Sequence, residues 1–280
     1  MSQHKEQQGF LTFAQNTDQV DYLQLAYLQA LNVKATQVQN RFAVIVDKQT
    51  AARVTDRHRQ VFDYVIELDN PAALPFANEP AAFTLTPFKE TVKLESDLLF
   101  TRSIDHWWTA FRIRDVYLPT AARTYLDSVG TVRRYRESFD QNHLPNVYNG
   151  LMYFRYSQCA RQFFQTTSRI FNNWELFRTQ LKSVDGPPTT DVVYALAALM
   201  VGSDQVTMPS MDFLNFVHMK SGFNGWSDTR TWTETVMNER DGDIIRINNI
   251  NQLNPVHYHD KTYATQELIE YYEQRILVSS

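Results

Sequence analysis

Two acidic residues separated by a single serine follow an apolar run in which a buried strand is predicted. The run covers residues 91–94 and leads directly into Glu95, Ser96 and Asp97. Carboxylates at the end of a buried strand are costly unless a positive group neutralises them. A divalent cation would do so, because hard cations bind carboxylate oxygens. An isolated acid-x-acid triplet is more commonly a solvated surface turn, so this interpretation depends on the rest of the chain.

Alternating strands and helices are predicted ahead of this triplet. Strands are expected at residues 9–14, 41–47 and 64–68, with a helix after each of the first two, the second at 51–62. Thr17 or Asp18 is the expected N-cap of the first helix. The strand runs are continuously apolar, which is typical of a parallel sheet covered by helices on both faces. Such sheets bind ligands at the carboxyl ends of their strands.

The composition indicates a folded globular protein. The chain has 280 residues, of which 43% are hydrophobic and 21% charged, so it can form a large core and carries too little charge for disorder. A formal net charge of −4 argues against nonspecific coating of nucleic acid. The single cysteine, Cys159, excludes an internal disulfide. The apolar runs are well short of the roughly 20 residues of a membrane span. Because the start is also polar, we expect no membrane span and a location in reducing cytosol.

Residues 85–97 resemble a motif of the GT-A glycosyltransferases, which use nucleotide sugars as donors. In the retaining members typified by glycogenin and bacterial galactosyltransferases the segment reads Leu-Thr-x-Tyr-x-Lys-x-Val-x-Leu-Asp-x-Asp, and here it reads LTPFKETVKLESD. The resemblance implies that Asp97 is a metal ligand. Glu95 stands where the family has Asp, and its extra methylene lets it reach the ion, the ribose or a bound water. Lys89, displaced by one position, corresponds to the family's basic residue.

Two later segments follow the family's order. Residues 144–155 resemble the strand whose Asn faces the donor sugar, which gives this role to Asn149, although an Asn-Gly turn is common by itself. Residues 187–191 end in Asp191, which the resemblance places near the sugar and the reacting centre. Asp191 is equally suited to be a helix N-cap or first-turn acid, and the two roles are compatible.

Residues 255–261, PVHYHDK, resemble the segment that completes the family's metal site. The resemblance implies that a His is the third metal ligand and that Lys261 contacts the donor diphosphate. His257 and His259 are both candidates, because side chains two residues apart in an extended segment point to the same side, and His257 is preferred. A His ligand favours Mn²⁺ over Mg²⁺, since Mg²⁺ prefers an all-oxygen shell.

The four matches cover roughly residues 9–262. Together they imply an α/β fold of the GT-A (Rossmann-like) type, with a mostly parallel central sheet, flanking helices and a C-terminal extension. The resemblance further implies a UDP-sugar donor and retention of anomeric configuration, with Asn149 and Asp191 as the catalytic residues. The nucleotide is expected over the first strand ends, at Ala14, Gln15, Asn16 and Asp47. The sequence identifies no nucleophile.

A single domain, residues 1–280, is expected because no linker or low-complexity stretch divides the chain. Within it, residues 9–100 form the expected nucleotide-binding half and residues 101–262 the sugar and acceptor half. Residues 263–280 are expected to form a C-terminal helix.

The middle of the chain is basic. Eleven Arg and no Lys lie between residues 102 and 178, against six acids. Arg133, Arg134 and Arg136 could bind phosphates bidentately, whereas the simpler interpretation is a solvated face with local ion pairs. The chain also resembles glycosyltransferase-like proteins of tailed bacteriophages, some of which modify cytosines in DNA. That resemblance implies a hydroxylated or hydroxymethylated cytosine in duplex DNA as acceptor, and the host cytoplasm as location.

Other functions remain open from the sequence. The acceptor could instead be a glycan, a lipid-linked sugar or a protein. Glu95 in place of Asp is also compatible with a catalytically silent GT-A domain that serves as a binding module. A sugar-phosphate nucleotidylyltransferase is disfavoured, because such enzymes usually carry a Gly-rich loop after the first strand and residues 15–21 contain no Gly.

Overall fold

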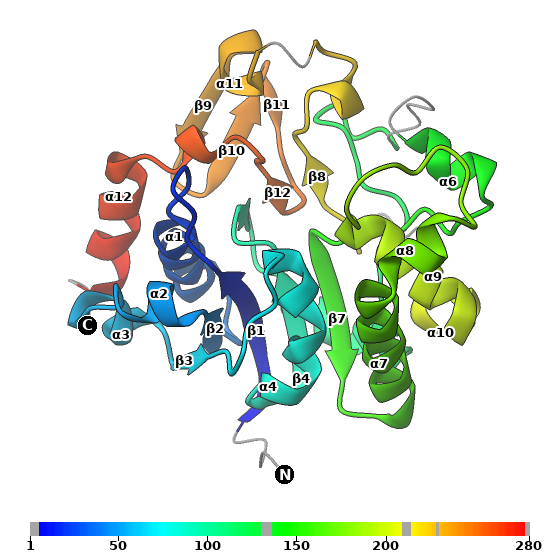
Figure 1. Ribbon diagram of the computed structural model, residues 1–280. Coiled ribbons are helices and arrows are strands. Elements are labelled where there is room, and N and C mark those ends of the chain that lie inside the picture. The colour runs from blue at the N-terminus through cyan, green and yellow to red at the C-terminus, as the bar shows by residue number, and fades with distance from the viewer. Residues whose placement is uncertain (1–5, 130–135, 209–213, 228–229, 278–280) are drawn as a thin grey trace.

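A central six-stranded sheet organises the protein. The computed structural model describes residues 6–129, 136–208, 214–227 and 230–277 (Figure 1). The strands, in the order in which they lie in the sheet, are β3 (Tyr64–Glu67), β2 (Phe42–Val46), β1 (Glu6–Ala14), β4 (Phe88–Leu94), β7 (Leu151–Arg155) and β6 (Val116–Tyr117). The first four are parallel to one another, whereas β7 runs antiparallel to β4 and β6 antiparallel to β7. The predicted α/β architecture with a mostly parallel sheet is therefore confirmed.

Helices cover both faces of this sheet because its strands are apolar on both. Phe10 and Val44 belong to a buried cluster with α1 (Tyr22–Thr36), and α12 (Gln266–Leu277) packs beside α1 (Figure 1). Leu11 and Ile45, the next residue along each strand, belong to a second cluster. That cluster includes α7 (Gln158–Asn172) and α9 (Thr190–Val201). Successive strand residues point to opposite faces, so each strand contributes to both clusters.

Helix starts differ from the sequence-based expectation. Helix α1 begins at Tyr22, and its N-cap is Asp21, whose carboxylate accepts a hydrogen bond from the backbone N–H of Gln24 at 3.1 Å. Thr17 and Asp18 were predicted for this role, and that prediction is wrong. The hydroxyl of Thr17 instead accepts a hydrogen bond from the N–H of Val20, in a turn ahead of the helix.

The second predicted helix is interrupted. It divides into α2 (Lys48–Ala51) and α3 (Asp56–Val61). Asp47 caps α2 by accepting from the N–H of Thr50 at 2.7 Å, and Thr55 begins α3 in a capping box with His58. Two N-cap signals within ten residues therefore produce two short helices instead of one.

Two small sheets complete the fold. One contains β5 (Leu98–Leu99), β12 (Val256–His257) and β8 (Val217–His218), and the other is an antiparallel meander of β9 (Asn238–Asp241), β10 (Ile244–Ile247) and β11 (Ile250–Asn251). In the first sheet, His257 pairs with Leu98 on one side and with His218 on the other. This register places His257 beside the residue that follows Asp97.

Short helices connect these elements. They are η1 (Pro75–Ala81), α4 (Ala82–Leu85), α5 (Trp107–Phe111), α6 (Glu137–Gln141), α8 (Trp174–Arg178), α10 (Ser203–Val206), η3 (Gly222–Asn224), α11 (Trp232–Thr235) and η4 (Lys261–Tyr263). Among the helices of the described ranges, none has both the length and the apolar character that a membrane span requires.

Candidate metal centre and substrate cleft

Three side chains converge just beyond the carboxyl end of β4. Glu95 and Asp97 follow that strand, and β12 contributes His257. The imidazole Nε2 of His257 lies 3.0 Å from Glu95 Oε2 and 3.0 Å from Asp97 Oδ2. One potential ligand atom from each residue lies within 4.8 Å of the other two. The ammonium of Lys261 forms an ion pair with Asp97 Oδ2, the same oxygen that His257 contacts.

The close packing of these charged groups shifts the pKa values of all three ligand candidates. Burial by itself lowers the pKa of His257, but the charges of Asp97 and Glu95 outweigh it and raise that pKa to about 10. Burial raises the pKa of Asp97, yet His257 and Lys261 oppose it and hold that pKa well below its usual range. The same balance with His257 lowers the pKa of Glu95. These shifts favour ionised carboxylates and a protonated imidazole between them.

These residues fit a divalent cation. Two carboxylate oxygens are directed at the same imidazole nitrogen, so a cation in place of the Nε2 proton would meet one nitrogen and two oxygen ligands. Hard oxygen ligands with one imidazole suit Mn²⁺, and Mg²⁺ less well. His259 was the alternative ligand, but His257 is the imidazole that contacts both carboxylates.

The side chain of Asn149 connects Glu95 to a buried ion pair. Its amide nitrogen donates to Glu95 Oε1 and to Glu79 Oε1, each at 3.1 Å. Its carbonyl oxygen accepts a hydrogen bond from Lys93 Nζ at 2.9 Å, and Lys93 in turn lies 2.7 Å from Glu79 Oε2. Asn149 is 2% exposed and Lys93 1% exposed. Asn149 was predicted to face the donor sugar, and in this structure its hydrogen bonds position Glu95.

Lys93, and not Lys89, is the basic side chain that β4 directs into the site. Lys89 lies near the beginning of β4, exposed, whereas Glu95 follows the other end of that strand. The six-residue separation corresponds to about 20 Å along a strand. Lys93 was missed although a signal existed, because residues 93 and 95 lie two apart at the end of a strand and two-residue spacing puts side chains on the same side.

Arg136 lies inside the protein, where it pairs with Asp191. Its guanidinium donates to Asp191 Oδ2 at 2.8 Å and to the carbonyl oxygen of Val147 at 3.0 Å. Its carbon Cζ lies 3.8 Å from the ring centre of Tyr148 and 4.3 Å from that of Phe139. Arg136 is only 7% exposed, so the prediction that it lies on an exposed DNA-binding face is wrong. A carboxylate and two aromatic rings are its partners instead of phosphates.

Several other arginines of the basic segment, residues 102–178, form ion pairs with nearby acids. Arg133 and Arg134 lie outside the described residues. Ion pairs join Arg112 to Glu90, Arg123 to Asp127, Arg155 to Asp115 and Arg178 to Glu175. Local ion pairs therefore neutralise a large part of the charge from which the sequence suggested a phosphate-binding surface.

His218 is a further member of the site. Its Nδ1 lies 3.1 Å from His257 Nδ1, and it is 6% exposed. Burial, followed by the charge of His257, holds the pKa of His218 well below its ordinary value. No sequence pattern identifies this residue, because a two-residue strand has no measurable periodicity.

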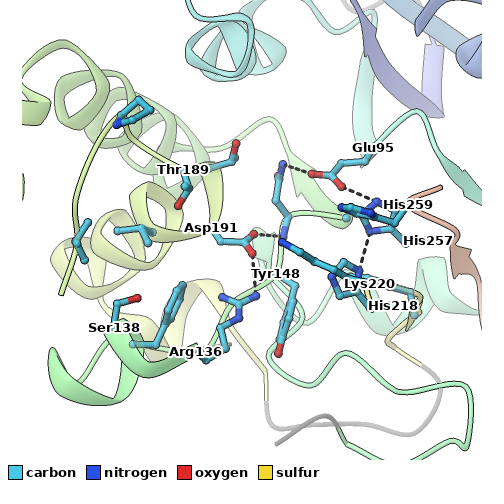
Figure 2. Close-up of a pocket in the computed structure, with 18 of the residues that line it drawn as sticks. Glu95, Arg136, Ser138, Tyr148, Thr189, Asp191, His218, Lys220, His257 and His259 are labelled. Carbon is cyan, nitrogen blue, oxygen red and sulfur yellow. Dashed lines mark hydrogen bonds and ion pairs between the residues drawn. The ribbon is translucent and has the colours of Figure 1, made fainter. Parts of the chain in front are cut away.

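The cleft around these residues has two lobes. The first, of about 400 Å³, we call the metal lobe; its lining includes Gln15, Tyr22, Lys93, Asp97 and Lys261. The second, of about 440 Å³, we call the Arg136 lobe; its lining includes Arg136, Tyr148, Asn149, Asp191 and Lys220. Glu95, Thr190, His257 and His259 line both lobes. Figure 2 shows the Arg136 lobe, with Asp191 and Arg136 facing each other and His257 between Glu95 and His218.

Of the four residues predicted to hold the nucleotide, Gln15 lines the metal lobe. Ala14 is fully buried in β1, where it packs in the core. The amide of Asn16 is engaged by Asp21 and by the N–H of Leu23, and the carboxylate of Asp47 by its helix cap. Asn16 and Asp47 thus organise the loops around the strand ends, and none of these three side chains lines the lobe.

This chain is similar to known proteins in its structure and not in its sequence. No family model matches the sequence, and no curated protein matches it. The structure is similar to mouse xyloside xylosyltransferase 1 in its apo form (TM-score 0.48, 12% identity, 72% of this chain and 84% of that chain). It is also similar to the bifunctional glycosyltransferase WbbM (TM-score 0.49, 10% identity, 82% of this chain and 42% of that chain). A third is the glycosyltransferase GlyE of Streptococcus pneumoniae TIGR4 (TM-score 0.44, 8% identity, 73% of this chain and 45% of that chain).

This chain therefore spans less than half the length of WbbM and of GlyE. With identities of 12% or less and TM-scores below 0.5, a functional assignment has to rest on the cleft itself.

Proposed function

We propose that this chain is a GT-A-type glycosyltransferase that uses a divalent cation to transfer a sugar from a UDP-sugar to an acceptor hydroxyl. The observation that carries the proposal is the cluster of Glu95, Asp97 and His257 at the junction of the two lobes. The position after a buried strand also matches the motif by which residues 85–97 resemble this family. A nucleotide diphosphate in one lobe and a sugar in the other would meet at that junction.

The chain's own residues would divide the work between the lobes. Glu95, Asp97 and His257 would hold the cation, which supplies charge stabilisation to the departing diphosphate. Lys261, which lines the metal lobe, would add a second positive charge beside the diphosphate. Asp191, oriented by Arg136, would bind the donor sugar from the Arg136 lobe. We assign no nucleophile, and retention of configuration rests on the family resemblance alone.

The metal lobe also offers surfaces for a base. Phe13, Tyr22 and Phe76 are among its lining residues. Aromatic rings of this kind stack on nucleobases without requiring a particular hydrogen-bond pattern. Gln15, at the carboxyl end of β1, supplies a polar group beside them. This combination supports a nucleotide ligand in the metal lobe.

For the acceptor we propose two sources of the hydroxyl group. A modified cytosine in duplex DNA is supported by the Arg-rich composition of residues 102–178, although Arg136 is buried and four other arginines of the segment are paired with acids. A glycan is supported by the Arg136 lobe, whose 440 Å³ falls in the range of roughly 300 to 1,000 Å³ typical of small-ligand pockets. Labelled sugar transfer to each acceptor, compared side by side, distinguishes them.

The test of the enzymatic proposal is Mn²⁺-dependent binding and hydrolysis of UDP-sugars. We expect a thermal shift with UDP-sugar that requires Mn²⁺, because a ligand that binds only the folded state raises its melting temperature. Asp97→Asn should abolish both the shift and hydrolysis, whereas Glu175→Gln, an exposed control on α8, should change neither. A folded Asp97→Asn variant with full Mn²⁺-dependent affinity would exclude the proposed metal centre. Binding without hydrolysis or transfer would instead support the silent binding module.

A further inference from the structure

The two histidines that pair across β8 and β12 share one hydrogen bond. His218 Nδ1 and His257 Nδ1 are 3.1 Å apart, so one of these nitrogens donates an N–H hydrogen bond and the other accepts it. The opposite nitrogen of His257, Nε2, is the atom directed at Glu95 and Asp97. Once a cation displaces the Nε2 proton, the ring keeps one proton, and that proton must then sit on Nδ1.

We infer that His218 is a positioning residue that holds His257 in the tautomer able to bind the metal. In the arrangement we propose, His218 Nδ1 is the acceptor and His257 carries its proton on Nδ1. His257 Nε2 then presents a lone pair between Glu95 and Asp97. This inference rests on the metal centre of the proposed function, and goes beyond it by naming the residue that orients its imidazole ligand.

The backbone fixes His218 for this task. His218 and His257 are directly paired in parallel strands, with the N–H of Met219 donating to the carbonyl oxygen of His257 at 3.0 Å. On the other side, the N–H of His218 donates to the carbonyl oxygen of Arg123 at 2.8 Å. Both strand neighbours thus restrain the position from which the His218 side chain extends.

The ring of His218 is also restrained by packing. Its centre lies 5.2 Å from the ring centre of Phe223 and 6.2 Å from that of Tyr148, both in edge-on geometry. Phe216 packs edge-on at 6.1 Å. With aromatic rings around it and 6% exposure, the imidazole has little room to rotate away from His257.

The alternative tautomer explains why such a device is useful. If His257 carried its proton on Nε2, that proton would bind the two carboxylates and occupy the position of the cation. A hydrogen-bond acceptor at Nδ1 disfavours this arrangement by stabilising the proton on the far side of the ring. Partners of this kind, which orient metal-bound imidazoles, typically change metal affinity by about 10- to 100-fold when they are removed.

The test compares two substitutions of the same residue. His218→Leu removes the acceptor, and we expect about a 10- to 100-fold loss of Mn²⁺ affinity in calorimetric titrations of the folded protein. His218→Asn should retain near wild-type affinity, because its amide oxygen can accept from His257 Nδ1. His143→Asn, at an exposed histidine that lines neither lobe, is the matched control and should not change affinity.

Equal affinities of wild type and folded His218→Leu would overturn the inference, and so would an equal loss in His218→Asn and His218→Leu. A second measurement requires no variant. In the Mg²⁺-loaded wild type, long-range proton–nitrogen NMR correlations should show a proton on His257 Nδ1 and none on His218 Nδ1. A proton on His218 Nδ1 with none on His257 Nδ1 would refute the role of His218. If wild type binds no divalent cation, the proposed metal centre fails as well, whereas intact wild-type binding with an unaffected Leu variant removes only this inference.

Discussion

The carboxylate of Asp191 joins Arg136 to the backbone of Asn149. One oxygen accepts from the guanidinium of Arg136 at 2.8 Å, and the other accepts from the N–H of Asn149 at 2.9 Å. Asp191 lies in the first turn of α9, Arg136 at the start of α6, and Asn149 just before β7. One side chain thus holds three segments around the Arg136 lobe.

Removal of Asp191 should therefore affect stability as well as transfer. Asp191→Ala leaves the buried guanidinium of Arg136 without its counterion. Because the Asp191 side chain is 30% exposed, we expect the free energy of unfolding to fall by about 3 kcal/mol, the lower end of the range for a broken buried pair. The double variant Arg136→Met with Asp191→Leu should regain part of this loss, because it removes both charges. Urea denaturation of the three proteins measures the difference. A single variant as stable as wild type would show that the pair is not coupled in the way its geometry indicates.

Substitution of the two lysines of β4 should have very different effects on UDP-sugar hydrolysis. Lys93→Met removes the ammonium that binds Glu79 and Asn149, so we expect UDP-sugar hydrolysis to fall by at least tenfold, about 1.4 kcal/mol of transition-state stabilisation. Lys89→Met, at the other end of the same strand, should leave kcat and KM near wild type. Steady-state kinetics of both variants measure the difference, and a stronger effect at Lys89 would restore the role that the family resemblance implies for it.

Asn149 should matter for metal binding. Because its amide donates to Glu95, we expect Asn149→Ala to weaken Mn²⁺ binding by about tenfold in addition to slowing transfer. The family resemblance alone predicts a different result, a loss of transfer with donor binding nearly intact. Asn146→Ala, three residues earlier in the chain, serves as control. Calorimetry with Mn²⁺ separates the two expectations directly.

Metal affinity should increase with pH. The carboxylates raise the pKa of His257 from 6.5 to about 10, so the cation competes with a proton for Nε2 at neutral pH. Mn²⁺ affinity should therefore rise by up to about tenfold per pH unit from pH 6.5 towards 10. Titrations at pH 6.5, 7.5 and 8.5 test this, and a flat profile would contradict it.

The same shift has the opposite effect on the metal-free protein. The stabilisation from protonated His257 is complete below pH 6.5, where the unfolded chain is protonated too, and is lost as pH rises through about 10. Added Mn²⁺ should thus stabilise the protein more at pH 8.5 than at pH 6.5.

The sequence was most informative where the signal is local. Continuous apolar runs predicted β1, β2 and β3, and the position of Glu95 and Asp97 after an apolar run predicted a charged cluster at the end of β4. The two-residue spacing of Lys93 and Glu95 along a strand indicates that both side chains point to the same side. Lys93 lies between two apolar residues, Val92 and Leu94, which is typical of a strand in the core and not of a site. Its partner Glu79 comes from a Pro-containing turn, and nothing in the sequence indicates that this turn folds over β4.

Arg136 and His218 could not be placed from the sequence for a different reason. Arg136 is surrounded by other arginines, and only the tertiary position of Asp191, 55 residues later, determines that it is buried. His218 meets His257 across 39 residues through the register of two-residue strands. Such contacts depend on how loops close in three dimensions, which hydrophobic periodicity does not encode.

The order in which the chain is synthesised has a consequence for the metal centre. Lys261 reaches Asp97 across 164 residues, and His257 joins the cluster from the same late segment. The carboxylates therefore leave the ribosome long before the imidazole and the ammonium that balance them. Closing so large a loop is entropically slow, so cation capture should be among the last events of folding rather than a nucleus for it. A nascent chain that stops before β12 can build most of the central sheet and still have no means of holding the ion.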